Sequence, residues 1–199
     1  MPWRTALAGT VLAVWTSAAS AQTDAAYGRC GDPSDRLRQI EACTQMIRDP
    51  SLSNYRRAGA YLYRCQAKDV SGKPAAALAD CRKAIELEDG DAASYNSLSI
   101  VHQGLKQWEE AIAASDEAIA IGGADIANFY NTRANARCGA KQVYGSVVDR
   151  LLAIRYGAVD AKNAQRLLKR DGFYTGVIDG KFGPASEAAL KAWTENRCG

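Results

Sequence analysis

The chain is poor in histidine, and this scarcity limits the chemistry that it can support. His102 is the only histidine among 199 residues, so any Ser-His-Asp or Cys-His arrangement would have to use it. It stands between Val101 and Gln103 in an expected helix, a placement typical of a packing or surface side chain. A phosphate-binding glycine loop is also missing from the sequence. We therefore predict a non-enzymatic protein with no catalytic residues and no cofactor.

An excess of charge of one sign is lacking as well. The formal net charge is +3, from 25 Lys and Arg against 22 Asp and Glu. A balance this close to zero does not favour nucleic acid as a partner. Paired carboxylates such as Glu109-Glu110 fit a solvated helix turn. Asp89-Gly90-Asp91 lacks the further ligands of a calcium loop and is better interpreted as a turn, so we predict no metal site.

Hydrophobic runs long enough to cross a membrane are absent. The apolar run from Thr5 to Trp15 is too short to span a bilayer. Arg4 precedes this run and Ala19-Ser20-Ala21 follows it, which is the order of a secretory signal peptide. We predict a signal peptide over residues 1–21, removed before Gln22, with an uncleaved anchor as the alternative. The mature chain is then expected to be periplasmic or secreted, with no membrane span.

Cysteine is well represented, with six residues that all follow the predicted cleavage site. An even number of cysteines in an oxidising compartment favours disulfides. A zinc site is the competing use, but it requires a close Cys-x-x-Cys or Cys/His cluster, which the sequence does not contain. We therefore predict structural disulfides among Cys30, Cys43, Cys65, Cys81, Cys138 and Cys198.

An internal repeat runs through the middle of the chain. Residues 76–87 and 110–121 share apolar positions that are 34 residues apart. Residues 145–156 repeat the pattern at an offset of 35, and residues 39–49 precede it at an offset of 38. A second helical stretch comes before each of the three later copies, and each of these stretches begins near a tyrosine: Tyr61, Tyr95 and Tyr130.

This helix-turn-helix unit, with an early Tyr and a late Ala-Ile pair, resembles the tetratricopeptide repeat. The resemblance implies an all-α solenoid of helical hairpins, which bury their apolar stripes only by stacking on one another. The sequence departs from the family where the closing Pro is absent and where Cys65 and Ser99 replace the usual small residue. The expected repeat domain, 22–157, contains a half repeat near 33–49 and repeats near 58–91, 92–126 and 127–157.

The front helices of tetratricopeptide repeats line a concave groove. An asparagine amide both donates and accepts hydrogen bonds, so a row of them is a candidate site for an extended peptide. Plain exposed polar positions are the alternative interpretation. The cations of the family's two-carboxylate clamp are missing from the matching positions, so a carboxylate-ended ligand is not predicted there. The inner positions of the family correspond to Leu62, Gln66, Asn96, Ile100, Asn131 and Asn135.

The repeats also suggest which cysteines pair. Cys65 and Cys81 occupy matching places on the two helices of one hairpin, and both become serine 34 residues later. Two cysteines that are lost together indicate a bonded pair. Cys43 holds the same back-helix place as Cys81, which makes Cys30 its expected partner and leaves Cys138 to pair with Cys198. Six cysteines permit many other connectivities, so the pairing stays a hypothesis at this point.

The stretch 160–193 has a distinct pattern of helix, glycine-rich loop and helix. Apolar residues recur at helical spacing before Gly172, and Gly183-Pro184 opens the second helix. The stretch resembles the peptidoglycan-binding domain-like family, from which it departs at Ser186 and at Trp193-Thr194. The matching positions are Leu167, Gly172, Phe173, Tyr174, Gly176, Asp179, Gly180, Phe182, Gly183 and Pro184. The resemblance implies a small three-helix domain over 158–199.

Several residues of this module are candidates for contact with peptidoglycan. If Phe173 points inward, Tyr174 is expected to point outward, where its ring could contact sugar or peptide. Lys169 and Lys181 could meet the carboxylates of the stem peptide, although isolated exposed charges are weak signals. Asp179 is also a candidate, but a backbone contact within its own turn is the simpler role. Phe182 and Trp193 are expected to pack between the helices.

Together these features predict an exported adaptor that binds peptidoglycan through its C-terminal module and an unidentified protein through its repeats. The envelope location and the peptidoglycan ligand come from the family resemblance. One alternative is a protein-interaction scaffold in which the module only caps the solenoid. Another is an accessory subunit of a separate cell-wall hydrolase.

Overall fold

The computed structural model describes residues 25–157 and 159–199, and all regular secondary structure in these ranges is helical. The predicted signal peptide, residues 1–21, lies outside the described residues. Residues 25–31 are helical. The helices that follow are α2 (Arg36–Arg48), α3 (Asn54–Val70), α4 (Pro74–Leu87), α5 (Ala92–Gly104), α6 (Trp108–Ile121), α7 (Ile126–Gly139), α8 (Val143–Arg155), α9 (Ala161–Arg170) and α10 (Pro184–Cys198).

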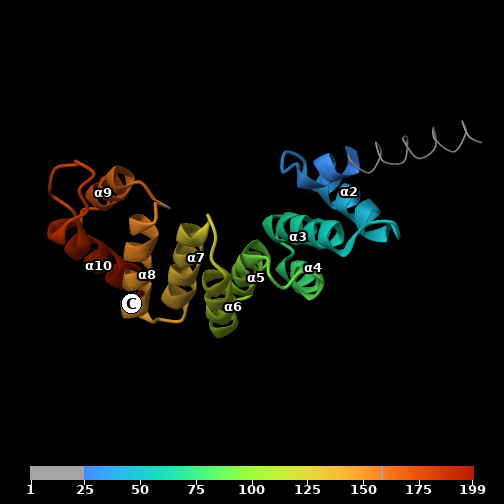
Figure 1. Ribbon diagram of the computed structural model, residues 1–199. Helices are drawn as coiled ribbons and strands as arrows, with labels where there is room; N and C mark the ends of the chain where they lie inside the picture. Colours follow the sequence, from blue (N-terminus) through green and yellow to red (C-terminus); the bar gives the residue numbers. More distant parts are fainter. Residues whose placement is uncertain (1–24, 158) are drawn as a thin grey trace, which may run out of the picture.

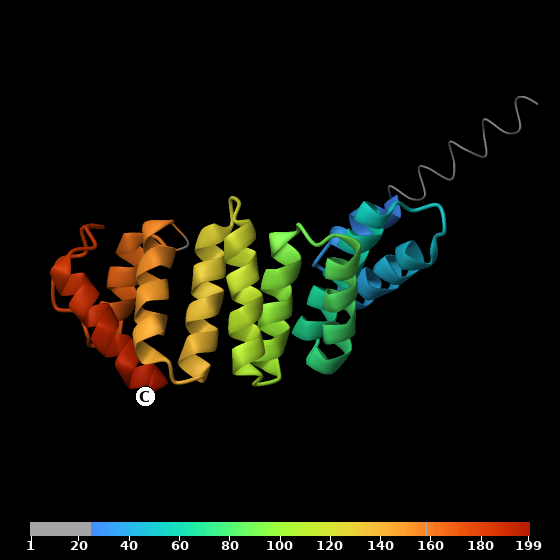
Figure 2. The ribbon, with the colours of Figure 1, turned by 60° about the horizontal axis from the view of Figure 1, so that its bottom comes forward.

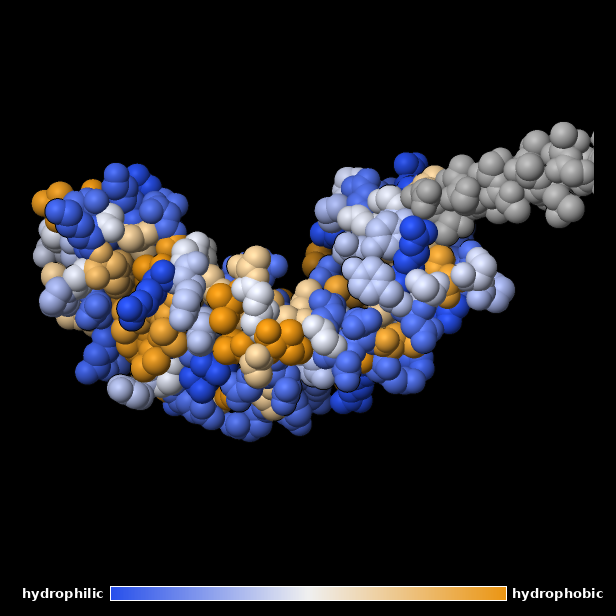
Figure 3. Space-filling view, in the orientation of Figure 1, coloured by the Kyte–Doolittle hydropathy of each residue, from blue (hydrophilic) through white to orange (hydrophobic). Residues whose placement is uncertain are grey.

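Helices α2 to α8 pack in chain order into a curved row, and α10 then packs against α8 (Figure 1). Three hairpins, α3–α4, α5–α6 and α7–α8, form its middle, and each packs against the next. Seen from another side, these helices stand side by side along the row (Figure 2). The row is hollowed on one side between its two ends (Figure 3). This is the hairpin solenoid that the period of the sequence repeat predicts.

Polar caps and prolines set where several helices begin. The carboxylate of Asp35 accepts hydrogen bonds from the backbone N–H groups of the first turn of α2. Asp91 does the same for α5, so Asp89-Gly90-Asp91 is the predicted turn between two repeats. Pro74 and Pro184 occupy the first turn of α4 and α10, where a missing N–H costs no hydrogen bond.

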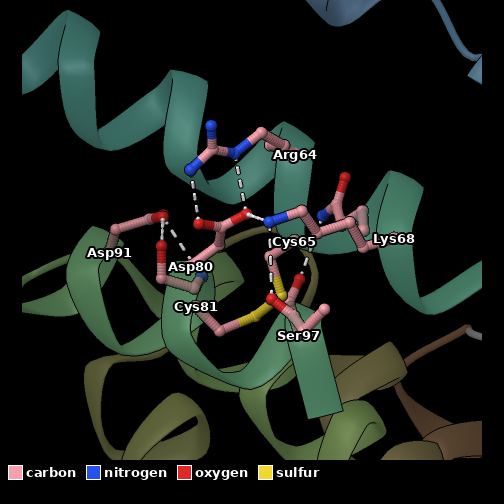
Figure 4. Close-up of a disulfide and its surroundings, with 10 residues drawn as sticks. Arg64, Cys65, Lys68, Asp80, Cys81, Asp91 and Ser97 are labelled. Carbon is pink, nitrogen blue, oxygen red and sulfur yellow. Dashed lines mark hydrogen bonds and ion pairs between the residues drawn. A yellow bond between two sulfur atoms is a disulfide. The ribbon is translucent and has the colours of Figure 1, made fainter. Parts of the chain in front are cut away.

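The three disulfides join the pairs that the repeat comparison predicts. They are Cys30–Cys43, Cys65–Cys81 and Cys138–Cys198, and no described cysteine is left free. Cys65–Cys81 links α3 to α4 inside the first hairpin (Figure 4), and both residues are fully buried. The prediction from the paired change of cysteine to serine is therefore confirmed.

The second hairpin holds a hydrogen bond at the place of that disulfide. Ser99 and Ser115 are fully buried, and their hydroxyl oxygens are 2.7 Å apart. The Ser99 hydroxyl donates to the carbonyl oxygen of Ala111 at 2.7 Å, so Ser115 must be the donor between the two serines. The same two positions thus connect front and back helices by a covalent bond in one hairpin and by a hydrogen bond in the next.

Buried carboxylates connect the helices of the first and third hairpins. Asp80 of α4 accepts from Arg64 (2.7 and 2.8 Å) and from Lys68 (2.7 Å), both on α3 (Figure 4). Asp149 of α8 is fully buried and accepts from two arginines of α7, Arg133 (2.6 and 2.9 Å) and Arg137 (2.8 Å). Each carboxylate is paired with two cations, which compensates for its loss of hydration.

The C-terminal module packs directly against the last hairpin. Leu168 of α9 and Leu190 and Trp193 of α10 form a buried cluster, and Leu151 and Ile154 of α8 pack on it. The described part of the module contains two helices, α9 and α10, so the prediction of three helices within 158–199 is wrong. Helix α8 of the repeats packs against them as a third helix. The Cys138–Cys198 bond ties the end of α10 to α7. Phe182 also packs against this cluster, so the roles predicted for Phe182 and Trp193 are confirmed.

The serine pair of the second hairpin indicates how the first hairpin would tolerate loss of its disulfide. We expect the double variant Cys65→Ser/Cys81→Ser to keep its helical fold, because two serines form a buried hydrogen bond at the matching place. Loss of the crosslink should lower the free energy of unfolding by about 3 kcal/mol. Urea unfolding followed by circular dichroism measures both properties, and an unfolded double variant would contradict the expectation.

Burial predicts a sharp contrast between the two carboxylates that contact Arg133. Asp149→Ala leaves Arg133 and Arg137 without their buried partner and should cost about 3–5 kcal/mol of stability. Asp116→Ala removes a half-exposed partner of the same Arg133 and should cost less than about 1 kcal/mol. Equal losses in urea unfolding of the two variants would contradict this ranking.

Candidate functional site

The loop between α9 and α10 is organised by one buried amide. Gln165 is fully buried, and its Oε1 accepts from the backbone N–H of Gly180 at 2.9 Å. Its Nε2 lies 3.1 Å from Asp179 Oδ1 and 3.1 Å from the carbonyl oxygen of Lys181. Ser186 Oγ is a further acceptor at 3.2 Å. These contacts fix the loop and the start of α10 to α9, although only two of the acceptors can be used at once.

Tyr174 lies inside the module, so the prediction that its ring points outward is wrong. Its side chain is 9% exposed and belongs to the buried cluster beneath the loop. Its hydroxyl donates to the carbonyl oxygen of Val177 at 3.0 Å. A Cβ atom at Gly176 would collide with the Tyr174 ring, so a glycine is needed there. Tyr174 is therefore a structural residue of the loop and not an exposed contact for sugar.

The other three candidates, Lys169 at the end of α9 and Asp179 and Lys181 in the loop, remain at the surface of the module. Asp179 accepts from the backbone N–H of Lys181 at 2.9 Å, which is the contact predicted within its own turn. Hydrogen bonds from Gln165 and then from that N–H hold the pKa of Asp179 below its ordinary value. Lys169 is exposed and its Nζ donates to the carbonyl oxygen of Gly176 at 3.1 Å. Lys181 is also exposed, so both cations remain accessible to an anionic ligand.

The predicted groove residues lie on the front helices of the three hairpins. Gln66 of α3 reaches α5, where its Nε2 donates to Ser97 Oγ at 3.0 Å. Asn96 of α5 has a buried Oδ1 that finds no hydrogen-bond donor among the described residues. Asn135 of α7 accepts from Arg150 at 3.2 Å. The inner position Leu62 is buried, whereas Ile100 is 43% exposed.

A small cavity opens where the last hairpin meets the C-terminal module. Its volume is about 70 Å³. Apolar surface gathers on this face around α8 and α10 (Figure 3). The side chains that line the cavity include Asn131 of α7, Arg150 and Ile154 of α8, Leu167 and Leu168 of α9, and Trp193 of α10. The groove residue Asn131 and the module therefore contribute to one site.

The described residues offer no arrangement for metal binding or for a membrane span. No group of three or more His, Cys, Asp or Glu side chains among them is placed to hold a metal ion. None of the helices that the structure describes is long and apolar enough to cross a membrane. His102 is buried, and its Nδ1 lies 2.7 Å from Oε1 of Gln107, which identifies it as a packing residue.

Comparisons with known proteins find a family match for the C-terminal module and solved structures with a similar fold. Residues 158–196 match the family model described as "Putative peptidoglycan binding domain". The solved structure "MamA RS-1 ArsTM double mutant" is similar with a TM-score of 0.61 and 18% identity, over 88% of this chain and 95% of that chain. "MamA 41-end from Desulfovibrio magneticus RS-1" has a TM-score of 0.62 and 15% identity, over 89% and 93% of the two chains. A search of curated proteins finds no match.

At these identities, the likeness to the solved structures establishes the fold alone. The fold is the all-α solenoid of tetratricopeptide type that the sequence repeats predict, followed by a small helical module. The family match covers the C-terminal module and not the repeats.

Two residues of the site were missed by the sequence interpretation, although both leave a signal in the sequence. Gln165 is a polar residue on the otherwise apolar face of α9, next to Ala164 and in line with Leu168. Arg150 stands at the repeat position of Cys81 and Ser115, at the offsets of 34 and 35 residues that define the repeat. A polar residue on a buried stripe and a cation at a crosslink position both indicate a specific contact.

The buried amide predicts that the loop depends on Gln165. We expect Gln165→Leu to lower the free energy of unfolding by about 1–3 kcal/mol, since the N–H of Gly180 then loses its acceptor inside the protein. Asn163→Leu, an exposed position on the same helix, is the control and should change stability little. Thermal unfolding of both variants tests this, and equal midpoints would contradict the role given to Gln165.

Proposed function

We propose that this protein is an exported, non-enzymatic adaptor that binds peptidoglycan through its C-terminal module and a protein partner through its repeats. The match of residues 158–196 to a peptidoglycan-binding family carries the first half of this proposal. The exposed Lys169 at the end of α9 and the exposed Lys181 in the loop fixed by Gln165 support it, because they offer two cations to an anionic polymer.

Disulfides support a location outside the cytoplasm. All six cysteines are bonded, and such bonds persist in oxidising compartments. Together with the proposed signal peptide over residues 1–21, the disulfides support a periplasmic or secreted mature chain. The division into repeats over 22–157 and a module over 158–199 belongs to the same proposal.

The hollow face of the solenoid supports a protein partner. Gln66 is exposed on a front helix, and its amide can both donate to and accept from an extended peptide backbone. Asn131 and Asn135 continue this face toward the module. A peptide in the groove would thus lie across the front helices from α3 to α7.

A second candidate function is that the module serves only as a cap of the solenoid. Its specific support is the packing of Leu151 and Ile154 against the module, together with the Cys138–Cys198 bond. A terminal repeat needs its exposed apolar face covered, and the module covers it. An accessory role beside a separate cell-wall hydrolase would use the same two surfaces.

Binding of the full oxidised chain to purified sacculi tests the leading proposal. We expect the native protein to bind the sacculi. The double variant Lys169→Gln/Lys181→Gln should bind them with a three- to tenfold weaker affinity, because losing two exposed charges costs about 1 kcal/mol of binding free energy. The control Lys73→Gln/Arg82→Gln removes two exposed cations from the first hairpin and should bind like the native protein.

Failure of the native chain to bind sacculi would favour the cap. If the native protein and the lysine variant bind sacculi with equal affinity, the adaptor proposal stands, but Lys169 and Lys181 are not the contacts.

A further inference from the structure

Arg150 is a partly buried cation that has no carboxylate partner among the described residues. It extends from α8, and its Nη2 donates to Asn135 Oδ1 at 3.2 Å. Its Nε is buried and has no hydrogen-bond partner in the part of the chain that the structure describes. Its guanidinium stacks on the Trp193 ring, 5.2 Å from the ring centre. A neutral amide and an aromatic face are thus its contacts, and neither neutralises its charge.

Two other groups of partly buried cations in the hairpins each share a carboxylate. Arg64 and Lys68 share Asp80, and Arg133 and Arg137 share Asp149. Among the described residues no carboxylate forms an ion pair with Arg150. A charge that is removed from water without a counter-ion is costly, so an unpaired cation at this depth calls for an anionic partner.

The surroundings of Arg150 add positive charge. Arg197 of α10 stacks on the same Trp193 ring, 4.7 Å from its centre. Burial, and to a smaller extent the charge of Arg197, lowers the pKa of Arg150. An anion bound here would be attracted by both guanidinium groups.

The cavity beside Arg150 limits what the anion can carry. It is apolar on the side of Ile154, Leu167 and Leu168, and its volume is about 70 Å³. This is far below the ~300 Å³ at which pockets for whole small molecules begin. A sugar ring or a large side chain exceeds this space, whereas a methyl group fits.

We propose that this junction binds the carboxylate-bearing D-alanine end of a peptidoglycan stem peptide. The terminal carboxylate pairs with the fork of Arg150, which is suited to two parallel hydrogen bonds. The methyl group of the terminal residue enters the apolar cavity, and the amide of Asn131 contacts the peptide backbone. The inference rests on the proposed function, because most of the residues that line the cavity belong to the module that matches the peptidoglycan-binding family.

Calorimetric titration of the full oxidised chain with a stem tetrapeptide ending in D-alanine tests the site. We expect binding that weakens at least about tenfold when the terminal carboxylate is converted to an amide, and equally in Arg150→Gln. Arg155→Gln removes an exposed cation from the same helix and should bind like the native protein. Arg150→Lys keeps the charge but loses the fork, so its affinity should be intermediate.

Several results would overturn the assignment. Equal affinity for the acid and the amide, or for the native protein and a folded Arg150→Gln, would show that the carboxylate does not meet Arg150. Should Arg150→Gln unfold, the comparison of acid with amide on the native protein still decides. Equal affinity for peptides ending in D- and L-alanine would indicate the C-terminus of a protein as the ligand.

Sacculus binding separates failure of this inference from failure of the proposed function. If the native protein binds sacculi and Arg150→Gln binds them equally well, the junction site is wrong and the adaptor function stands. If the native protein binds neither sacculi nor the tetrapeptide, both proposals are wrong.

Discussion

The structure depends on a connection between the front and back helices of each hairpin. The interfaces are rich in alanine, which buries little apolar area per residue, so packing alone gives each hairpin a thin core. The first hairpin adds the Cys65–Cys81 bond and the Asp80 ion pairs, and the second adds the Ser99–Ser115 hydrogen bond. The third uses the ion pairs of Asp149. Front and back helices are thus connected by a disulfide, a hydrogen bond or ion pairs. On the back helices these use two neighbouring repeat positions, that of Asp80 and Asp149 and that of Cys81 and Ser115.

The sequence predicted those features that repeat or that change in pairs. The hairpin order follows from the 34-residue period, and the disulfide of the first hairpin follows from two serines at the matching positions. Asp179 was predicted correctly because an Asx turn is a local structure. These are short-range or periodic signals, and a single sequence contains them in full.

Other features depend on contacts between distant segments, and these were missed. The outward Tyr174 assumed that neighbours in the loop alternate between inside and outside. In the structure the backbone N–H groups of Phe173 and Tyr174 both point to the carbonyl oxygen of Leu168, which turns the chain and carries both rings toward the core. Gln165 and Arg150 owe their roles to a loop and a helix that lie far along the chain.

The two functions proposed for the module, capping the solenoid and binding a ligand, can use the same packing of the module on α8. Covering the last hairpin brings Trp193 over Arg150 and encloses the cavity between α8 and α9. The same docking that covers the apolar face of α8 therefore creates the small apolar cavity beside Arg150. The proposed site beside Arg150 therefore exists only when the module is packed on α8.

The bond between Cys138 and Cys198 also has a mechanical consequence. It joins the end of α7 directly to the end of α10, across 60 positions of the sequence. A pulling force applied to α10 passes through this bond into the solenoid, so the segment between the two cysteines is relieved of the load. The module cannot be peeled away from the repeats by tension as long as the bond is oxidised, and reduction would convert a rigid anchorage into an extensible one.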